Sequence, residues 1–381
     1  MKVPAIAKDI RVRGALAALG LVLVFLLYSA HEQSKISAAS IPSTSLLAAP
    51  EAASNTAASN AQASSGATTT STISVASSSN TVKATALPSS TPVPTINPAQ
   101  VASQELTASG GKLLHSLVNI VCVSSDPSIP SISGSGVIID SRVIILTAAH
   151  VAQLFLLQDY LGPNKVACLI RTGSPARRAY LAEPIYVSPS WIKNNSHTLT
   201  STAPQGTGEN DFALLGITGT ATSTPLPTSF PALPLGHTDP IVGQNFAIGS
   251  YGAQYLSSSE LNYSLYPILV FGTVQDRYTY HTNTLDLVSV IGSAASQEGS
   301  SGGALVDSGG EVSGIITTSS VAGTLANRSL NAITISHIRR SFTADTGDDL
   351  DSIIAENNLS DLIASFAQTS KTLGAFLANN L

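Results

Sequence analysis

The stretch GSSGGAL at residues 299–305 places a serine inside a glycine-rich turn that leads into an apolar strand. Two other stretches also put a reactive side chain at the end of a strand. LTAAHV at residues 146–151 is an apolar strand that ends in small residues and a histidine, and NDFALL at residues 210–215 has an acid directly before an apolar strand. A serine, a histidine and an acid are therefore available at three strand ends.

Hydrolysis of an amide by a serine requires this nucleophile, a base within hydrogen-bond reach, and an acid that fixes the tautomer of the base. Ser301, His150 and Asp211 supply these groups in that order. The neighbouring glycines let the backbone N–H groups of Gly299 and Ser301 point at one spot, where the oxyanion of a tetrahedral intermediate would form. A lone Ser-Gly-Gly sequence is usually an ordinary turn, so the prediction depends on all three stretches. The other histidines, among them His337, lack comparable context, and we expect them to be ordinary surface or capping residues.

From about residue 111 onward, short apolar runs are separated by Gly, Pro, Ser and Asn. Many short strands at close spacing are typical of an all-β barrel or sandwich. The candidate strands are residues 117–123, 136–140, 143–147, 166–171, 180–187, 212–217, 245–248, 269–274, 285–291, 304–306, 312–317 and 332–335.

The order His, Asp, Ser resembles that of the trypsin/chymotrypsin-fold serine proteases, and within them the bacterial HtrA (Deg)-like branch. SGSGVII at residues 133–139 resembles the family's strand that enters the hairpin before the histidine. EVSGII at residues 311–316 resembles the strand that lines the substrate cleft after the serine. The resemblance implies protein or peptide substrates and no cofactor or metal. It makes His150 the general base, Asp211 its orienting acid and Ser301 the nucleophile.

The resemblance also implies the fold, which is all-β with two six-stranded antiparallel Greek-key barrels. The first barrel, roughly residues 117–217, would bring His150 and Asp211, and the second, roughly residues 235–335, would bring Ser301, with the active site between them. We assign residues 110–342 to this protease domain. In residues 343–381 apolar side chains recur at helical spacing, which predicts an amphipathic helical tail that packs on the barrels.

Two departures from the family's pattern limit what the resemblance implies. The digestive relatives have an aspartate before the nucleophile, which accepts a newly cut N-terminus, whereas this chain has the uncharged Ser300. HtrA-like proteases usually carry a PDZ domain after the barrels, and the roughly 40 residues that follow here are too few for one. We therefore expect neither activation by a cleaved N-terminus nor gating by a PDZ domain.

The resemblance places the floor of the primary substrate pocket at Ala295 and the edge of the cleft at Thr317 and Ser319. No acid lies at this floor to pair with a lysine or arginine of the substrate. We therefore expect a small or medium apolar side chain before the scissile bond.

The chain has two cysteines, Cys122 and Cys168, which are too few for a disulfide scaffold or a four-cysteine zinc site. They fall on the first and fourth predicted strands, which are neighbours at the closure of the family's first barrel. Outside the cytoplasm a disulfide would join this closure. The alternative is a pair of buried free thiols, and the sequence leaves both open.

An uncharged apolar stretch at residues 14–30 follows a basic segment at residues 1–13. It is at the short end of the roughly 17–25 residues that cross a bilayer. The basic flank predicts that residues 1–13 lie in the cytoplasm, that residues 14–30 cross the membrane once, and that the rest of the chain lies on the extracytoplasmic side. We favour an uncleaved signal anchor over a cleaved signal peptide, which would leave the protein secreted. Residues 31–109, rich in Ser, Thr, Ala and Pro, are predicted to be a disordered linker.

Charged residues make up 11% of the chain and the net charge is −5, with no basic block beyond the first residues. Nucleic-acid binding is disfavoured because it needs a basic face to neutralise phosphates. The sequence predicts a membrane-tethered, extracytoplasmic serine endopeptidase. The alternative is a catalytically silent protease-fold module that binds a surface. The sequence does not predict the oligomeric state or the natural substrate.

Overall fold

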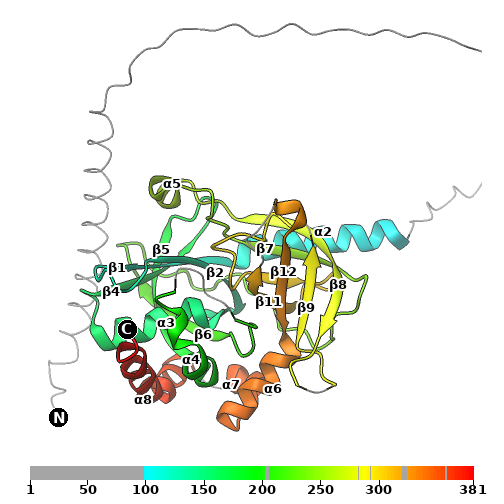
Figure 1. Ribbon diagram of the computed structural model, residues 1–381. Coiled ribbons are helices and arrows are strands. Elements are labelled where there is room, and N and C mark those ends of the chain that lie inside the picture. The colour runs from blue at the N-terminus through cyan, green and yellow to red at the C-terminus, as the bar shows by residue number, and fades with distance from the viewer. Residues whose placement is uncertain (1–97, 202–205, 282, 292, 320–323, 357) are drawn as a thin grey trace, which may run out of the picture. The chain divides into compact units, whose positions relative to one another are not determined.

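The computed structural model describes residues 98–381 apart from 202–205, 282, 292, 320–323 and 357 (Figure 1). The predicted basic segment 1–13, the apolar stretch 14–30 and linker residues 31–97 lie outside the described residues. Within the described ranges, no helix combines the length and the apolar character needed to cross a membrane.

Two closed six-stranded barrels form the body of the described chain, and all their pairings are antiparallel, which confirms the predicted barrels. The first, in the order β1-β2-β3-β6-β5-β4, consists of β1 (Leu117–Ser124), β2 (Ile132–Asp140), β3 (Ile144–Thr147), β4 (Val166–Thr172), β5 (Arg178–Val187) and β6 (Ala213–Thr220). The second, in the order β10-β11-β12-β9-β8-β7, consists of β7 (Asn245–Ser250), β8 (Ile268–Tyr278), β9 (Leu287–Ile291), β10 (Ala304–Val306), β11 (Val312–Ser319) and β12 (Ser329–Thr334).

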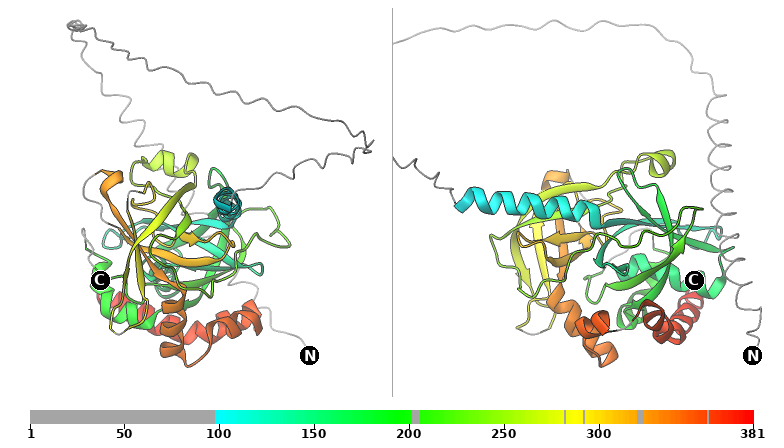
Figure 2. Two further views of the ribbon diagram at one scale, coloured as in Figure 1. Left: turned by 90° about the vertical axis from the view of Figure 1, so that its right-hand side faces the viewer. Right: turned by 180° about the vertical axis from the view of Figure 1, so that it is seen from behind.

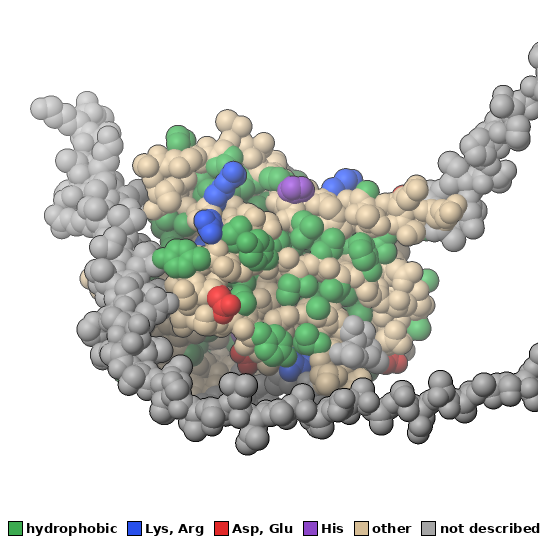
Figure 3. All heavy atoms as spheres, turned by 90° about the horizontal axis from the view of Figure 1, so that it is seen from above, with side chains coloured by type: hydrophobic (Ala, Val, Ile, Leu, Met, Phe, Trp, Pro, Cys, Tyr) green, Lys and Arg blue, Asp and Glu red, His purple; other side chains and the backbone are tan. Residues whose placement is uncertain are grey.

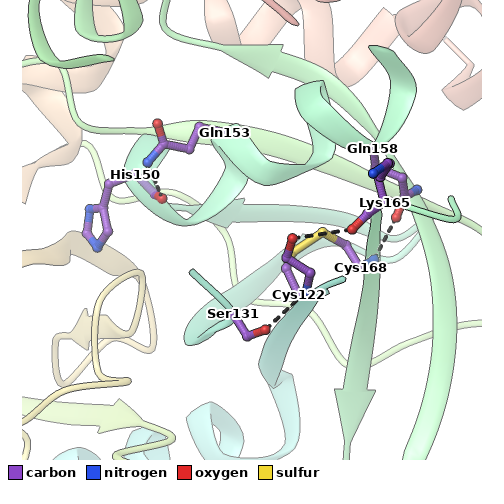
Figure 4. The surroundings of a disulfide bond; sticks show 8 residues. Cys122, Ser131, His150, Gln153, Gln158, Lys165 and Cys168 are labelled. Atoms are coloured by element: carbon purple, nitrogen blue, oxygen red, sulfur yellow. Dashed lines mark hydrogen bonds between the residues drawn. A yellow bond between two sulfur atoms is a disulfide. The ribbon is translucent and has the colours of Figure 1, made fainter. Parts of the chain in front are cut away.

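The first barrel closes where β1 pairs with β4, and Cys122 and Cys168 are direct partners in that pairing. The structure joins them by a disulfide (Figure 4). Of the two alternatives that the sequence left open, the structure therefore contains the bonded one. Gln158, from the helix that follows β3, accepts a hydrogen bond from the backbone N–H of Cys168 (2.6 Å) and so links this helix to the closure.

Helix α2 (Pro98–Ser116) corrects the predicted boundary between linker and protease domain. The sequence predicts disorder up to residue 109, whereas the structure has residues 98–109 in this helix. Ser109 is buried and its hydroxyl donates to the backbone oxygen of Ser308 (3.0 Å), and Leu113 is fully buried. The buried residues described in α2 lie from Ser109 onward, and Leu106 before them is partly buried against the core. The composition therefore gave no signal, because the helix is stabilised by these tertiary contacts rather than by an apolar stripe along its length.

Helix α3 (Ala149–Leu161) starts at the end of β3 and was not predicted from the sequence. Its side chains are buried on nearly every side from Ala149 to Leu157, so its sequence has no amphipathic period. Helix α8 (Leu359–Ala378) covers it. A Cβ atom on Gly374 of α8 would lie only 2.7 Å from the backbone oxygen of Leu156, so the two helices approach closely at this glycine.

The predicted C-terminal tail is helical, although its first helix starts earlier than residue 343. Helix α6 (Ile335–Thr346) follows β12 directly, and α7 (Leu350–Glu356) and α8 come after it. These helices lie on the side of the barrels opposite to the short helix α5 (Ser258–Tyr263) (Figures 1 and 2). Seen from above, the described surface carries scattered hydrophobic side chains and few charged ones (Figure 3), in keeping with the small share of charged residues.

Candidate active site

His150 and Asp211 form the best-defined part of the site. Asp211 is 3% exposed, and its two carboxylate oxygens accept from His150, one from the backbone N–H (2.9 Å) and one from the ring nitrogen Nδ1 (2.7 Å). An ionised carboxylate only accepts, so the neutral imidazole carries its proton on Nδ1 and leaves Nε2 as the acceptor. That is the tautomer a general base requires.

Short local elements hold the two residues in this arrangement. Strand β3 ends at Thr147, and His150 is the second residue of α3, whose first turn is fixed when Gln153 Nε2 donates to the His150 carbonyl oxygen (2.9 Å; Figure 4). Asp211 precedes β6, and Asn210 before it has a left-handed backbone (φ 58°). This turn aims the carboxylate at the start of α3.

The environment shifts the pKa of His150. Burial of the ring disfavours its charged form, but the negative charge of Asp211 and its hydrogen bond outweigh this, so the pKa lies above the ordinary 6.5. The His150 side chain is still 31% exposed. His150 is therefore a stronger base than free histidine and remains accessible to a substrate.

The loop that carries Ser301 lies against the segment that leads to His150. Gly302 has φ 83°, and a Cβ atom there would overlap the backbone oxygen of Ser135 and the hydroxyl of Thr147, and would lie 3.1 Å from the backbone nitrogen of Ala148. Only glycine fits this approach. The three stretches singled out in the sequence therefore meet where the two barrels face each other.

The backbone N–H of Gly299 points away from the contacts that fix its peptide. The carbonyl oxygen of Glu298, in the same trans peptide, accepts from the backbone N–H of Ala253 (2.7 Å). Carbonyl and N–H of a trans peptide point in opposite directions. The Gly299 N–H is thus directed away from Ala253, in the backbone conformation (φ 88°) that glycine permits.

The backbone N–H of Ser301 is arranged in the same way. The carbonyl oxygen of Ser300 accepts from the N–H of Gly303 (2.9 Å), which directs the N–H of Ser301 to the other side. Among the hydrogen bonds of residues 98–381 that the structure describes, none uses the N–H of Gly299 or Ser301 as donor. Two unpaired donors therefore flank the Ser301 hydroxyl.

Ser301 is partly exposed, and within the described part of the chain no hydrogen bond joins its hydroxyl to His150. Hydrogen bonds between catalytic groups are often long in unliganded enzymes and tighten only with substrate. The structure thus contains a bonded His150–Asp211 pair and a separate Ser301, with the residues before His150 packed on the Ser301 loop.

The three residues predicted to line the substrate pocket differ in what the structure describes of their surroundings. Ala295 is fully buried, and its N–H donates to the hydroxyl of Ser293 (3.0 Å). Thr317 is 4% exposed on β11, and its hydroxyl has no partner among the described residues. The side chain of Ser319 lies outside the described part of the structure.

Sequence reasoning missed Arg328, which lies beside the predicted pocket floor. Arg328 is 4% exposed, and one guanidinium nitrogen donates to the backbone oxygen of Ser296 (3.0 Å) and to Gln254 Oε1 (2.6 Å). It thereby ties two loops of the second barrel together. No local pattern around residue 328 signals this role, because both partners are distant in sequence.

Residues 134–315 match the family model of the trypsin-like peptidase domain. This segment is a trypsin-like peptidase domain. Such domains are those of serine-type endopeptidases, and the match spans His150, Asp211 and Ser301. The barrels extend past both ends of the match, since β1 of the peptidase domain precedes it and β12 follows it. The narrower assignment to the HtrA-like branch stays a prediction.

Several solved structures are similar to this chain. The Rv3671c protease of M. tuberculosis in its active form shares 17% identity over 69% of this chain and 95% of its own (TM-score 0.40). An inactive serine-to-alanine mutant of Rv3671c shares 16% over 67% and 97% (TM-score 0.40). A serine endoprotease of Yersinia pestis shares 19% over 64% and 67% (TM-score 0.39). No curated protein matches the chain. The family assignment does not rest on these three structures.

Proposed function

We propose that the protein cleaves peptide bonds through a covalent acyl-enzyme on Ser301, with His150 as general base and Asp211 as its orienting acid. The observation that supports this most is the bonded His150–Asp211 pair beside a loop in which the N–H groups of Gly299 and Ser301 are unpaired. A base with a free Nε2 and two aligned donors are what acyl transfer requires.

In the first half-reaction, His150 Nε2 takes the hydroxyl proton of Ser301 as Oγ attacks the scissile carbonyl carbon. The carbonyl oxygen becomes an oxyanion and accepts from the N–H groups of Gly299 and Ser301. When the intermediate collapses, the C–N bond breaks and protonated His150 gives its proton to the leaving amine. In the second half-reaction, water replaces the amine. His150 deprotonates it, and the proton returns to Ser301 Oγ as the carboxylic acid leaves.

Treatment of the full-length protein in detergent with a fluorophosphonate probe tests this proposal. We expect one label on Ser301, and no labelling or casein cleavage by Ser301→Ala at an unchanged melting temperature. The matched control is Ser300→Ala, which removes the adjacent buried hydroxyl and should keep most of the labelling. A wild-type protein that is folded but takes no label would instead favour the silent surface-binding module.

We also propose that residues 14–30 anchor the protein in a membrane with the peptidase domain on the extracytoplasmic side. The apolar stretch after a basic segment supports this, as does the Cys122–Cys168 disulfide, since such bonds persist in oxidising compartments. Fractionation of cells that express the full chain should find it in membranes, and an external protease should digest its C-terminal domain in spheroplasts. Recovery in the soluble cytoplasmic fraction would contradict the proposal. Recovery from the medium would indicate a cleaved signal peptide.

A further inference from the structure

Ser135 belongs to β2 of the first barrel, yet three hydrogen bonds join it to loops of the second barrel. Its backbone N–H donates to the carbonyl oxygen of Ser301 (2.8 Å), and its hydroxyl donates to that of Gly299 (2.7 Å). The same hydroxyl accepts from the backbone N–H of Tyr251 (2.8 Å), and the Ser135 carbonyl accepts from the Thr147 hydroxyl (2.7 Å). The side chain is fully buried, so water cannot replace these bonds.

The two carbonyl groups that Ser135 holds alternate with two that are held inside the second barrel. Along the loop, the carbonyl oxygens of Glu298 and Ser300 accept hydrogen bonds from within the second barrel, while those of Gly299 and Ser301 accept from Ser135. Every carbonyl from residue 298 to residue 301 therefore has a partner. With all four fixed, the N–H groups of residues 299 and 301 stay free for a ligand.

The residue directly before Ser301 carries no charge that could hold this loop. Ser300 is 1% exposed and uncharged, and its hydroxyl is bonded to that of Ser250 (3.0 Å). Gly299, at φ 88°, lacks the side chain that would restrict rotation of its peptides. If the Gly299 carbonyl lost its donor, rotation there would turn the neighbouring N–H groups away from the oxyanion position. The Ser135 hydroxyl, which donates to the Gly299 carbonyl, opposes this rotation from the first barrel.

We propose that Ser135 is a positioning residue that holds the oxyanion-binding loop of the second barrel in its active arrangement from the first barrel. The inference rests on the proposed function, because the loop matters only if Ser301 is acylated. Ser135 does not touch the substrate. It acts through the peptide groups of Gly299 and Ser301.

The test measures the second-order rate of fluorophosphonate labelling, together with kcat and KM for a fluorogenic peptide taken from a mapped casein cleavage site, for full-length Ser135→Ala. We expect the labelling rate and kcat to fall about 10–100-fold with little change in KM, since loss of one oxyanion donor costs about 10²–10³ in kcat. The pH profile of kcat/KM should keep its acidic limb, because His150 and Asp211 are untouched.

Ser133→Ala is the matched control, since Ser133 lies two residues away on the same strand and its hydroxyl accepts from Asn119 instead of the loop. We expect it to lose stability without a comparable loss of labelling. Ser135→Cys, which keeps the shape and a weaker donor, should label at an intermediate rate, and it carries the test if Ser135→Ala does not fold.

Wild-type labelling rates in folded Ser135→Ala, or in Ser135→Cys with its native disulfide intact, would overturn the inference. So would equal rate losses in Ser133→Ala and Ser135→Ala, because these would indicate a general effect on the strand. If the wild type itself takes no label on Ser301, the proposed function fails. If the wild type takes the label and the Ser135 variants label at the same rate, only the inference about Ser135 fails.

Discussion

The described part of the protein contains two histidine–aspartate pairs in which a ring Nδ1 bonds to a carboxylate, and the surroundings of the two pairs differ. In the first barrel, His150 Nδ1 bonds to Asp211 at 2.7 Å. In the second pair, His337 Nδ1 of helix α6 bonds to Asp286, which precedes β9, at 3.0 Å. The first pair lies beside the loop that carries Ser301, which packs on the residues before His150.

The two carboxylates differ in the number of residues from which they accept hydrogen bonds. Asp211 accepts both of its protein hydrogen bonds from His150. Asp286 also accepts from the backbone N–H of Tyr280 (2.8 Å) and from the Arg340 guanidinium (2.6 Å). Burial alone would raise the pKa of Asp286, but the bonds from Tyr280, His337 and Arg340 lower it to about 2. Its charge is thus spread over several partners.

The histidines respond in opposite directions. The pKa of His150 is raised, because Asp211 outweighs the effect of burial. The pKa of His337 is lowered, because burial outweighs Asp286 and the nearby Arg340 opposes a second positive charge. The His337 side chain is 9% exposed, compared with 31% for His150. A histidine–aspartate hydrogen bond therefore does not by itself make a base. The first pair differs in that its ring is more exposed and its carboxylate accepts its side-chain and backbone bonds from His150.

The largest expected effect comes from neutralising each carboxylate. Asp211→Asn should lower kcat/KM about 10⁴-fold with a modest change in melting temperature, because the histidine loses its correct tautomer. Asp286→Asn should leave kcat/KM within about tenfold but lower the free energy of unfolding by about 3 kcal/mol, since Arg340 and His337 lose a buried counter-charge. Peptide hydrolysis and urea unfolding of both variants make the comparison. Equal activity losses would show that Asp286 belongs to the catalytic machinery.

The pH dependence gives a smaller effect with opposite signs for the two histidines. A raised folded-state pKa means that His150 takes up its proton first in the folded protein, so its contribution to stability grows as the pH falls through that pKa toward 6.5. For His337 the unfolded chain takes up the proton first, so stability is lost as the pH falls from 6.5 toward the lowered pKa. We expect His337→Gln to flatten the acid-side loss of stability and His150→Gln to steepen it in urea titrations.

In the same pH range, kcat/KM should depend on the protonation of His150 and not on that of His337. The acidic limb of kcat/KM should lie above pH 6.5 in the wild type and in His337→Gln, because the base must be neutral to accept a proton. A limb that moves with His337→Gln would contradict the separation of the two pairs.

The smallest expected effect is at Asn210, which connects the pairs. Its Oδ1 atom accepts from the Ser341 hydroxyl (2.6 Å) and lies 3.3 Å from His337 Nε2, while its backbone leads directly into Asp211 at φ 58°. Asn210→Gly should remove the link yet keep the left-handed turn, and Asn210→Ala should cost about 1–2 kcal/mol more in unfolding.

Both Asn210 variants should lower kcat/KM by less than about 100-fold, through a small displacement of Asp211. Equal unfolding free energies for the two would show that the left-handed backbone is not strained by a side chain. An unchanged kcat/KM in both would show that the His337 network does not position Asp211.

Much of the barrel could be predicted from the sequence, because each of the predicted strands falls on an observed one. Alternating or continuous apolar runs between turn residues are a local signal. Helix α3 gave no such signal since it is buried on nearly all sides, and α2 gave none since its described buried residues begin only at Ser109. The expectation that His337 is an ordinary surface or capping residue was wrong, because its partner Asp286 is distant in sequence.

By itself, the sequence determined the β-rich class, the candidate residues His150, Asp211 and Ser301, and the glycines that let the backbone turn at Ser301, since each of these depends on a residue type or a short spacing. The tertiary structure decided which groups these residues meet. The joining of Cys122 to Cys168 required the first barrel to close, and the hold of Ser135 on the Ser301 loop required the two barrels to face each other. Hydrogen bonds and burial of this kind join residues far apart along the chain, and only the fold brings them within reach.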